Sequence, residues 1–222
     1  MNDLNNLKNE LANVGRYLLA HELAWGTSGN MSARLDEDNM VITASGTFMG
    51  DLGQDDFVIT HIPTGTYEGT RRASKETPFH TGIYNRRPDV GAILHSSPFY
   101  STMVACSETS IFSELFIETM YYLENIAYVN YYHPGTEELG KAIAEKSEEA
   151  NVIIMKNHGV VVFDDYLTEA KMRLETMEMA CRMIITAKSS GIMLNRIPDK
   201  VVTSFLEDSK YKPRKILGGQ KK

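Results

Sequence analysis

Residues 151–165 read NVIIMKNHGVVVFDD, and this stretch decides the fold. Two short apolar runs, residues 152–155 and 160–163, flank the turn-forming triplet Asn157-His158-Gly159. Runs of this length, separated by a short turn that contains glycine, are typical of a β-hairpin. We therefore predict two paired strands with His158 at the tip of the turn.

Strand and helix patterns alternate on both sides of this hairpin. AILHSS (92–97), VITAS (41–45) and DFVIT (56–60) predict strands, and residues 128–149 predict a strand, a turn and a helix opened by Thr136. Helical spacing is found from about residue 4 to 23, over 75–87 where Pro88 ends the helix, over 98–107, and over 167–190 before Gly191. There is no repeat or linker, so we expect one α/β domain over 1–208, with helices on both sides of a central, mostly antiparallel sheet. The basic residues 209–222 are expected to form a mobile tail.

Composition excludes several classes of protein. The chain has 222 residues, of which 42% are hydrophobic and 23% charged, as in a globular protein. No apolar run reaches the roughly 18 to 20 residues of a membrane span, and the N-terminal residues do not resemble a signal peptide. A net charge of −6 argues against a nucleic-acid partner. The two cysteines suggest a reducing compartment, so a cytoplasmic location is expected.

Three polar residues interrupt patterns that are otherwise apolar. His95 ends the run Ala92-Ile93-Leu94, His158 occupies the hairpin tip, and Glu76 opens a helix four residues before His80. One carboxylate and two imidazoles from three separate segments are typical of a catalytic metal site with an open position. The sequence therefore predicts that Glu76, His95 and His158 converge on a divalent ion. Zinc is the first choice, with manganese, cobalt or iron as alternatives.

Glycine-bearing loops upstream suggest an anion pocket. Residues 26–30 read GTSGN and residues 44–47 read ASGT, and backbone N–H groups in such loops can surround a phosphate. Ser74 and Lys75 add a hydroxyl and a charge at the start of a helix. The predicted phosphate-binding residues are Ser28, Gly29, Asn30, Ser45, Gly46, Ser74 and Lys75.

Together, these motifs resemble the class II aldolase/adducin family. The order GTSGNMS (26–32), ITASG (42–46), Ser74-Lys75-Glu76 with His80, RPD (87–89) through His95, and NHG (157–159) covers roughly residues 5 to 190. That family includes L-fuculose-1-phosphate aldolase, L-ribulose-5-phosphate 4-epimerase, related sugar-acid phosphate decarboxylases and the non-enzymatic head of adducin. The resemblance implies a three-layer α/β/α domain and a homotetramer with sites between subunits. It also implies that Glu76 is the catalytic acid/base and that His95 and His158 are metal ligands.

The sequence departs from the family pattern at three positions. The usual His-X-His is His95-Ser96-Ser97 here, so Ser97 replaces a metal ligand, and His80 or His133 could substitute for it or orient a ligand. Phe116 lies near the place of the tyrosine that aldolases use as a proton donor. The candidates to replace that tyrosine are Tyr121, Tyr122 and Tyr211. Lys75 replaces a phosphate-contacting serine, as expected in the decarboxylase-like branch.

These observations predict a metal-dependent lyase that acts on a small phosphorylated sugar or sugar acid. Retro-aldol cleavage of a ketose phosphate through an enediolate is the first choice, with Glu76 moving the proton. Decarboxylation of a 3-oxo sugar-acid phosphate is the second choice, favoured by Lys75, and epimerisation is the third. The alternative of another class is a non-catalytic, adducin-like binding domain, which the loss of histidine at Ser97 favours.

Residues 111–132, IFSELFIETMYYLENIAYVNYY, suggest self-association. The stretch is rich in Phe, Tyr and Ile and poor in charge, as an interface between subunits would be. Together with the family resemblance, it predicts a homo-oligomer, most simply a tetramer.

Overall fold

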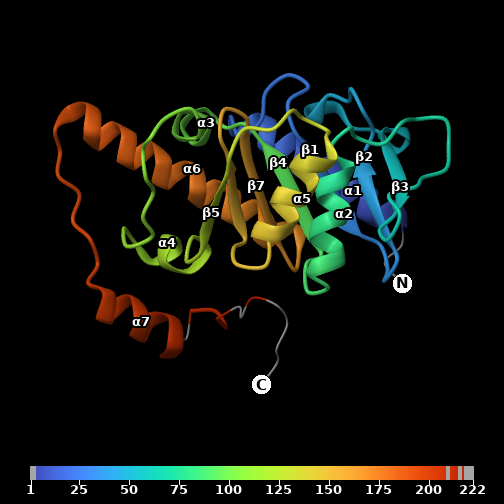
Figure 1. Ribbon diagram of the computed structural model, residues 1–222. Helices are drawn as coiled ribbons and strands as arrows, with labels where there is room; N and C mark the ends of the chain where they lie inside the picture. Colours follow the sequence, from blue (N-terminus) through green and yellow to red (C-terminus); the bar gives the residue numbers. More distant parts are fainter. Residues whose placement is uncertain (1–3, 209–210, 215–216, 218–222) are drawn as a thin grey trace.

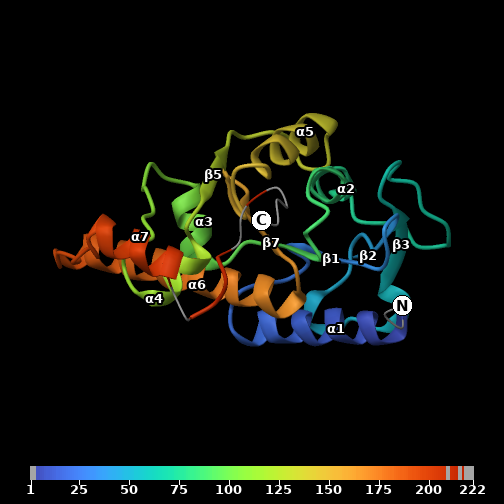
Figure 2. The same cartoon turned by 90° about the horizontal axis from the view of Figure 1, so that it is seen from below.

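A seven-stranded sheet lies between two layers of helices in the computed structural model, which describes residues 4–208, 211–214 and 217 (Figures 1 and 2). The strand order is β3-β2-β1-β4-β7-β6-β5, and all neighbours are antiparallel except β5 and β6. The strands are β1 (Asn30–Arg34), β2 (Asn39–Thr43), β3 (Phe57–His61), β4 (Ala92–Ser96), β5 (Ile126–Val129), β6 (Val152–Met155) and β7 (Gly159–Asp164). The predicted three-layer α/β/α fold with a mostly antiparallel sheet is confirmed.

The hairpin expected over 151–165 is present as β6 and β7, which pair from Val152 with Val162 to Met155 with Gly159. Asn157 adopts a left-handed conformation in the turn, with φ of 57°. A Cβ atom at Gly159 would lie only 2.7 Å from the backbone oxygen of Ser96, so glycine allows the start of β7 to approach the end of β4. This close approach brings the turn residue His158 next to the end of β4.

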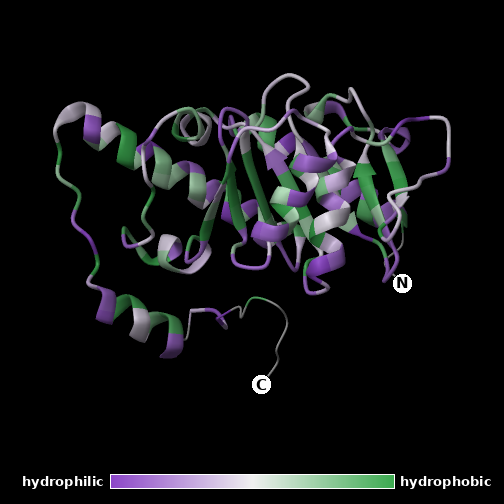
Figure 3. Cartoon of the chain, in the orientation of Figure 1, coloured by the Kyte–Doolittle hydropathy of each residue, from purple (hydrophilic) through white to green (hydrophobic). Residues whose placement is uncertain are grey.

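Helices α1 (Leu4–Ala20) and α6 (Leu167–Ser190) cover one face of the sheet, together with the shorter α3 (Phe99–Ala105) and α4 (Ile117–Tyr122). The long helix ends as predicted at Gly191, whose φ of 74° is left-handed. Its buried stripe includes Leu174, Met177, Cys181 and Ile184. Apolar strands form the centre of the molecule, and the polar residues of the helices lie outside (Figure 3). No helix in the described part of the chain is long and apolar enough to cross a membrane.

Helices α2 (Thr77–Arg86) and α5 (Glu137–Lys146) cover the other face of the sheet. Thr136 caps α5 as predicted, because its hydroxyl accepts a hydrogen bond from the backbone N–H of Leu139 at 3.3 Å. The two helices touch through glycine. A Cβ atom at Gly140 would lie 2.9 Å from the Cβ atom of Pro78, at the start of α2.

The C-terminal part of the chain shows one helix and several contacts that the sequence analysis did not predict. An unpredicted helix, α7 (Asp199–Asp208), lies against α4 below the body of the molecule in Figure 1. The described residues of the predicted mobile tail make specific contacts. Lys212 Nζ lies 2.8 Å from Glu169 Oε1, and the hydroxyl of Tyr121 donates to the Pro213 oxygen at 2.9 Å. The other residues of the predicted tail lie outside the described residues.

The aromatic stretch 111–132 is only partly exposed, so its interpretation as an interface needs correction for two tyrosines. Tyr121 and Tyr122 are 7% and 0% exposed and pack in the core with α1 and α6. Their rings are large enough to fill the space between α4 and the sheet, which removes them from the surface. The large apolar and aromatic side chains of this stretch that remain exposed are Ile117, Tyr128, Tyr131 and Tyr132.

Substitution of Gly140 tests the contact between α2 and α5. We expect Gly140→Ala to lower the free energy of unfolding by about 1–2 kcal/mol, because overpacking against the Pro78 backbone, in the upper part of the usual range of about 1–3 kcal/mol, outweighs a helix-propensity gain of ~1 kcal/mol. Urea denaturation measures this difference. Lys141→Ala, at an exposed position of the same helix, should change stability by less than about 0.5 kcal/mol. Equal stability of both variants would mean that the two helices can separate without cost.

Candidate active site

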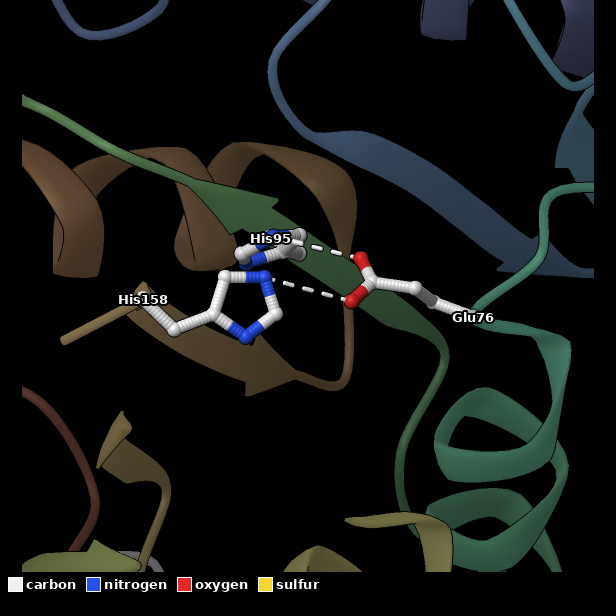
Figure 4. A group of neighbouring side chains, drawn as sticks. All are labelled: Glu76, His95 and His158. Carbon is white, nitrogen blue, oxygen red and sulfur yellow. Dashed lines mark ion pairs between the residues drawn. The ribbon is translucent and has the colours of Figure 1, made fainter. Parts of the chain in front are cut away.

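The structure brings Glu76, His95 and His158 together from three elements (Figure 4). His95 lies near the end of β4, His158 lies in the β6–β7 turn, and Glu76 occupies the position directly before α2. His95 Nε2 lies 3.2 Å from Glu76 Oε2, and His158 Nε2 lies 3.3 Å from Glu76 Oε1. One potential ligand atom from each residue lies within 4.8 Å of the other two. The convergence expected from the sequence is therefore present.

The hydrogen bond made by His95 gives a first indication of a cation site. His95 Nδ1 lies 3.0 Å from the backbone oxygen of Val160, which can only accept, so this nitrogen carries the hydrogen. In the neutral ring, Nε2 then presents a lone pair toward the Glu76 carboxylate. Metal-binding histidines show the same pattern, with the outer nitrogen donating to a carbonyl and the inner one facing the ion.

His158 provides a second indication of a cation site. Burial lowers the pKa of His158 to about 4, with a further lowering by His95 and an opposing effect of Glu76, so the ring is neutral at pH 7. Among the described residues, Glu76 Oε1 accepts no hydrogen bond although His158 is adjacent. Buried acceptors without donors are costly, and a divalent ion would satisfy them. Two imidazoles and one carboxylate suit zinc and other divalent transition metals.

Neither of the two histidines suggested as a further ligand joins this group among the described residues. Ser97 lines the same pocket, and its hydroxyl donates to the backbone oxygen of His158 at 3.2 Å. His80 is completely buried, and both of its ring nitrogens are hydrogen-bonded, to Asn30 and Ser32. His133 is exposed and lies outside both the group and the lining of the pocket. His80 thus lies behind the site.

A cavity of about 460 Å³ opens in front of the three residues. Its lining includes every residue that the sequence suggested for phosphate binding, namely Ser28, Gly29, Asn30, Ser45, Gly46, Ser74 and Lys75. Lys75 is exposed there, and within the described chain its ammonium group has no assigned partner. Hydroxyls, an amide and a lysine beside a cation site form a pocket suited to an anionic ligand.

Backbone conformation explains the glycines of this pocket. Gly29 has φ of 92°, and a Cβ atom there would lie 2.5 Å from the backbone oxygen of His95. Gly46 has φ of 76° with open space around it, so conformation alone requires glycine there. Ser74 accepts a hydrogen bond from the backbone N–H of Glu76 at 3.3 Å, which leaves its own hydroxyl hydrogen available to a ligand.

The predicted site residues do not include five that line the cavity, Trp25, Thr27, Ala44, Thr47 and Pro134. Trp25 is 65% exposed, and its Nε1 donates to the backbone oxygen of Ser97 at 3.1 Å. A large ring held at the mouth of a pocket limits what can enter. The signal in the sequence was a tryptophan directly before a glycine-rich loop.

The three candidate proton donors do not line the cavity of their own chain. The hydroxyl of Tyr122 donates to Glu169 at 3.0 Å, and that of Tyr121 donates to Pro213. Because both tyrosines are buried and engaged, only Tyr211, at 39% exposure, presents its ring at the surface.

Comparison with known proteins gives a consistent result. A family model described as Class II Aldolase and Adducin N-terminal domain matches residues 9–185. L-fuculose phosphate aldolase of Methanocaldococcus jannaschii is 29% identical over 178 residues, which cover 80% of this chain and 95% of that protein. The 3-oxo-tetronate 4-phosphate decarboxylase of Haemophilus influenzae is 27% identical over 190 residues, which cover 83% and 90%. A solved structure of L-fuculose 1-phosphate aldolase matches with a TM-score of 0.80 and 27% identity, covering 93% of this chain and 97% of that one.

Restoring an imidazole at position 97 tests the cation site. Even residues that only orient metal ligands change affinity by about 10–100-fold, so an added direct ligand in Ser97→His should tighten Co²⁺ binding at least about tenfold. Titration of the metal-free protein with Co²⁺, followed by visible absorption, measures the affinity. Ser97→Asn adds bulk without an imidazole and should bind no more tightly than the original protein. Equal affinities of the two variants would mean that position 97 does not face the ion.

Proposed function

This chain belongs to the class II aldolase and adducin family, and we propose that it is a metal-dependent lyase acting on a small phosphorylated sugar or sugar acid. The observation that carries the proposal is the group of Glu76, His95 and His158 at the floor of a pocket lined by anion-binding groups. The relatives named as an aldolase and as a decarboxylase support the same class of reaction, cleavage of a carbon–carbon bond.

Each part of the pocket would have a distinct task. A bound divalent ion would supply Lewis acidity for a carbonyl next to the cleaved bond. Glu76 would take or give the proton at the reacting carbon, because its carboxylate is the only acidic group among the described residues that line the pocket. The glycine loops and Ser74 would bind the phosphate, which holds the reacting bond beside Glu76.

Retro-aldol cleavage of a ketose phosphate is our first choice, and decarboxylation of a 3-oxo sugar-acid phosphate is the second. Lys75 favours the second, because an exposed ammonium group in the pocket could bind a carboxylate as well as a phosphate. Epimerisation of a sugar phosphate is the third choice. A screen of ketose phosphates and 3-oxo acid phosphates, scored separately for aldehyde and for carbon dioxide, distinguishes these reactions. Protein purified without chelator that contains no metal and turns over none of them would favour the non-catalytic alternative.

Lys75 gives a direct test of substrate binding. If Lys75 contacts the substrate, Lys75→Ala should raise KM about 10- to 150-fold, corresponding to the 1.5–3 kcal/mol of a charged hydrogen bond. Steady-state kinetics on the substrate found in the screen measures this change. Lys141→Ala removes an exposed lysine of α5 and should leave KM unchanged. Equal KM values for the two variants would place Lys75 on the surface without a role in binding.

We also propose that the chain assembles into a homo-oligomer, most simply a tetramer. Large side chains remain exposed in the single chain, including Trp25 and Phe99 at 65% each and Tyr131 at 57%. Exposed aromatic rings of this kind support an interface. A neighbouring chain could then contribute Tyr211 as the proton donor. Phe116, which lies near the place of the family's tyrosine, has no hydroxyl for this role.

Light scattering at micromolar concentration tests the assembly, with an expected mass near four times the 24.9 kDa of one chain. A mass of one chain would contradict it. Mixing inactive Glu76→Ala with Tyr211→Phe tests the shared site. Recovered activity is expected if the two residues meet between subunits, and a mixture as inactive as its components would leave each site within one chain.

A further inference from the structure

Polar side chains of β1 and α2 face each other in two matching rows behind the candidate active site. Asn30 and Ser32 are alternate residues of β1, so both point to the same face of the sheet. Glu76, His80 and Tyr84 follow one another at intervals of four and lie on one face of α2. Two strand residues advance about 6.7 Å, and four helical residues advance about 6 Å, so the two rows stay in register.

Short hydrogen bonds connect the two rows into one chain. Asn30 Nδ2 donates to Glu76 Oε2 at 2.7 Å, and Asn30 Oδ1 lies 2.6 Å from His80 Nε2. His80 Nδ1 lies 2.7 Å from the Ser32 hydroxyl, which lies 3.0 Å from the Tyr84 hydroxyl. All five side chains are buried, and Ser32 and His80 are 0% exposed. Every link therefore has to be satisfied within the chain.

The two ends of the chain determine the direction of every bond. The carboxylate of Glu76 only accepts, so Asn30 presents its N–H to Glu76 and its oxygen to His80. His80 must then donate from Nε2, which leaves Nδ1 to accept from Ser32. Burial raises the pKa of Tyr84, so its hydroxyl keeps its hydrogen and donates it to Ser32. Burial also lowers the pKa of His80 well below its usual range, which keeps the ring neutral, with one donor and one acceptor.

We propose that Tyr84, Ser32, His80 and Asn30 form a relay of neutral hydrogen bonds that orients the Glu76 carboxylate, with His80 as the positioning residue. This proposal deepens the proposed function, because it names residues that position the group assigned to proton transfer and metal binding. His80 does not line the cavity, its hydrogen bonds within the described residues go to Asn30 and Ser32, and it acts on Glu76 through the amide of Asn30. Without the N–H of His80, the Asn30 amide could rotate and present its oxygen to the Glu76 carboxylate.

The relay also connects the anion pocket to the carboxylate. Asn30 lines the cavity, and its amide nitrogen has a second hydrogen beyond the one given to Glu76. Because His80 binds the amide oxygen, the amide nitrogen with both of its hydrogens stays on the side of Glu76. An anion in the cavity and the Glu76 carboxylate can thus bind to one amide group, whose orientation is fixed from behind.

The first test measures the tautomer of His80 in the unaltered protein. Long-range ¹H–¹⁵N NMR spectra at pH 7.5 distinguish a ring protonated at Nε2 from one protonated at Nδ1, and the signal is assigned by its absence from a His80 variant. The relay requires the Nε2–H form. The Nδ1–H form would overturn the proposal, because His80 could then not donate to Asn30.

The second test compares two amides at position 80. Glutamine can place an N–H near the position of Nε2 and restore the bond to Asn30, whereas asparagine reaches only the position of Nδ1 and restores the bond to Ser32. We expect His80→Asn to weaken Co²⁺ binding about 10–100-fold and to change the visible absorption of the bound ion. His80→Gln should bind several times more tightly than His80→Asn. Equal weakening by both variants, or tighter binding by His80→Asn, would overturn the relay.

Melting temperatures of both variants separate positioning from folding. Both substitutions remove the same buried ring, so similar melting temperatures with different Co²⁺ affinities would identify the bond to Asn30 as the cause. If neither variant folds, the NMR measurement on the unaltered protein decides. These measurements involve no turnover, so the relay can hold even if every substrate of the proposed function fails, and it can fail while a lyase reaction is observed.

Discussion

The structure depends on one electrostatic constraint, the Glu76 carboxylate held against the imidazoles of His95 and His158. His95 Nδ1 donates to a backbone oxygen of β7, so Nε2 is the ring nitrogen that faces Glu76. Among the described residues, no donor reaches Glu76 Oε1, and a buried acceptor without a donor is costly. A divalent cation removes this cost, and the fold is built so that the three side chains cannot move apart.

Rigid elements maintain this contact. His95 belongs to the central strand β4, which pairs with β1 on one side and β7 on the other. His158 is fixed by the tight turn before Gly159, and Glu76 is fixed by helix α2, which packs closely on α5. Both close contacts depend on glycine, Gly159 in the turn and Gly140 in α5, because a Cβ atom there would meet Ser96 or Pro78. The same small residues that allow the sheet and the helices to pack therefore position the chemistry.

The sequence predicted those parts of the structure that depend on local patterns. The hairpin, the long helix and the Glu76, His95 and His158 group could be predicted, because each is marked by periodicity or by a polar residue that ends an apolar run. The contacts of the tail could not, since Lys212 binds Glu169 across 43 residues and no local pattern specifies that pair. Burial of Tyr121 and Tyr122 was also missed, because composition does not distinguish a core ring from an interface ring. The partners of His80 could have been predicted from the sequence. Ser32 lies two residues after Asn30, on the same face of a strand, and Tyr84 lies four residues after His80, on the same face of a helix.

The balance of charge explains why neutral groups orient Glu76. Among the described residues, Glu76 lies 3.2–3.3 Å from the two imidazoles, and its closest hydrogen-bond donor is the uncharged amide of Asn30. An arginine or lysine in that place would cancel the negative charge that attracts a divalent ion. With an ion of charge +2 bound, Glu76 contributes −1, a phosphate monoester contributes about −1.5 to −2, and Lys75 contributes +1, so the loaded pocket is close to neutral. The histidine that the family resemblance places at position 97 and the serine found there are both uncharged, so serine removes a potential ligand atom and preserves this balance of charge.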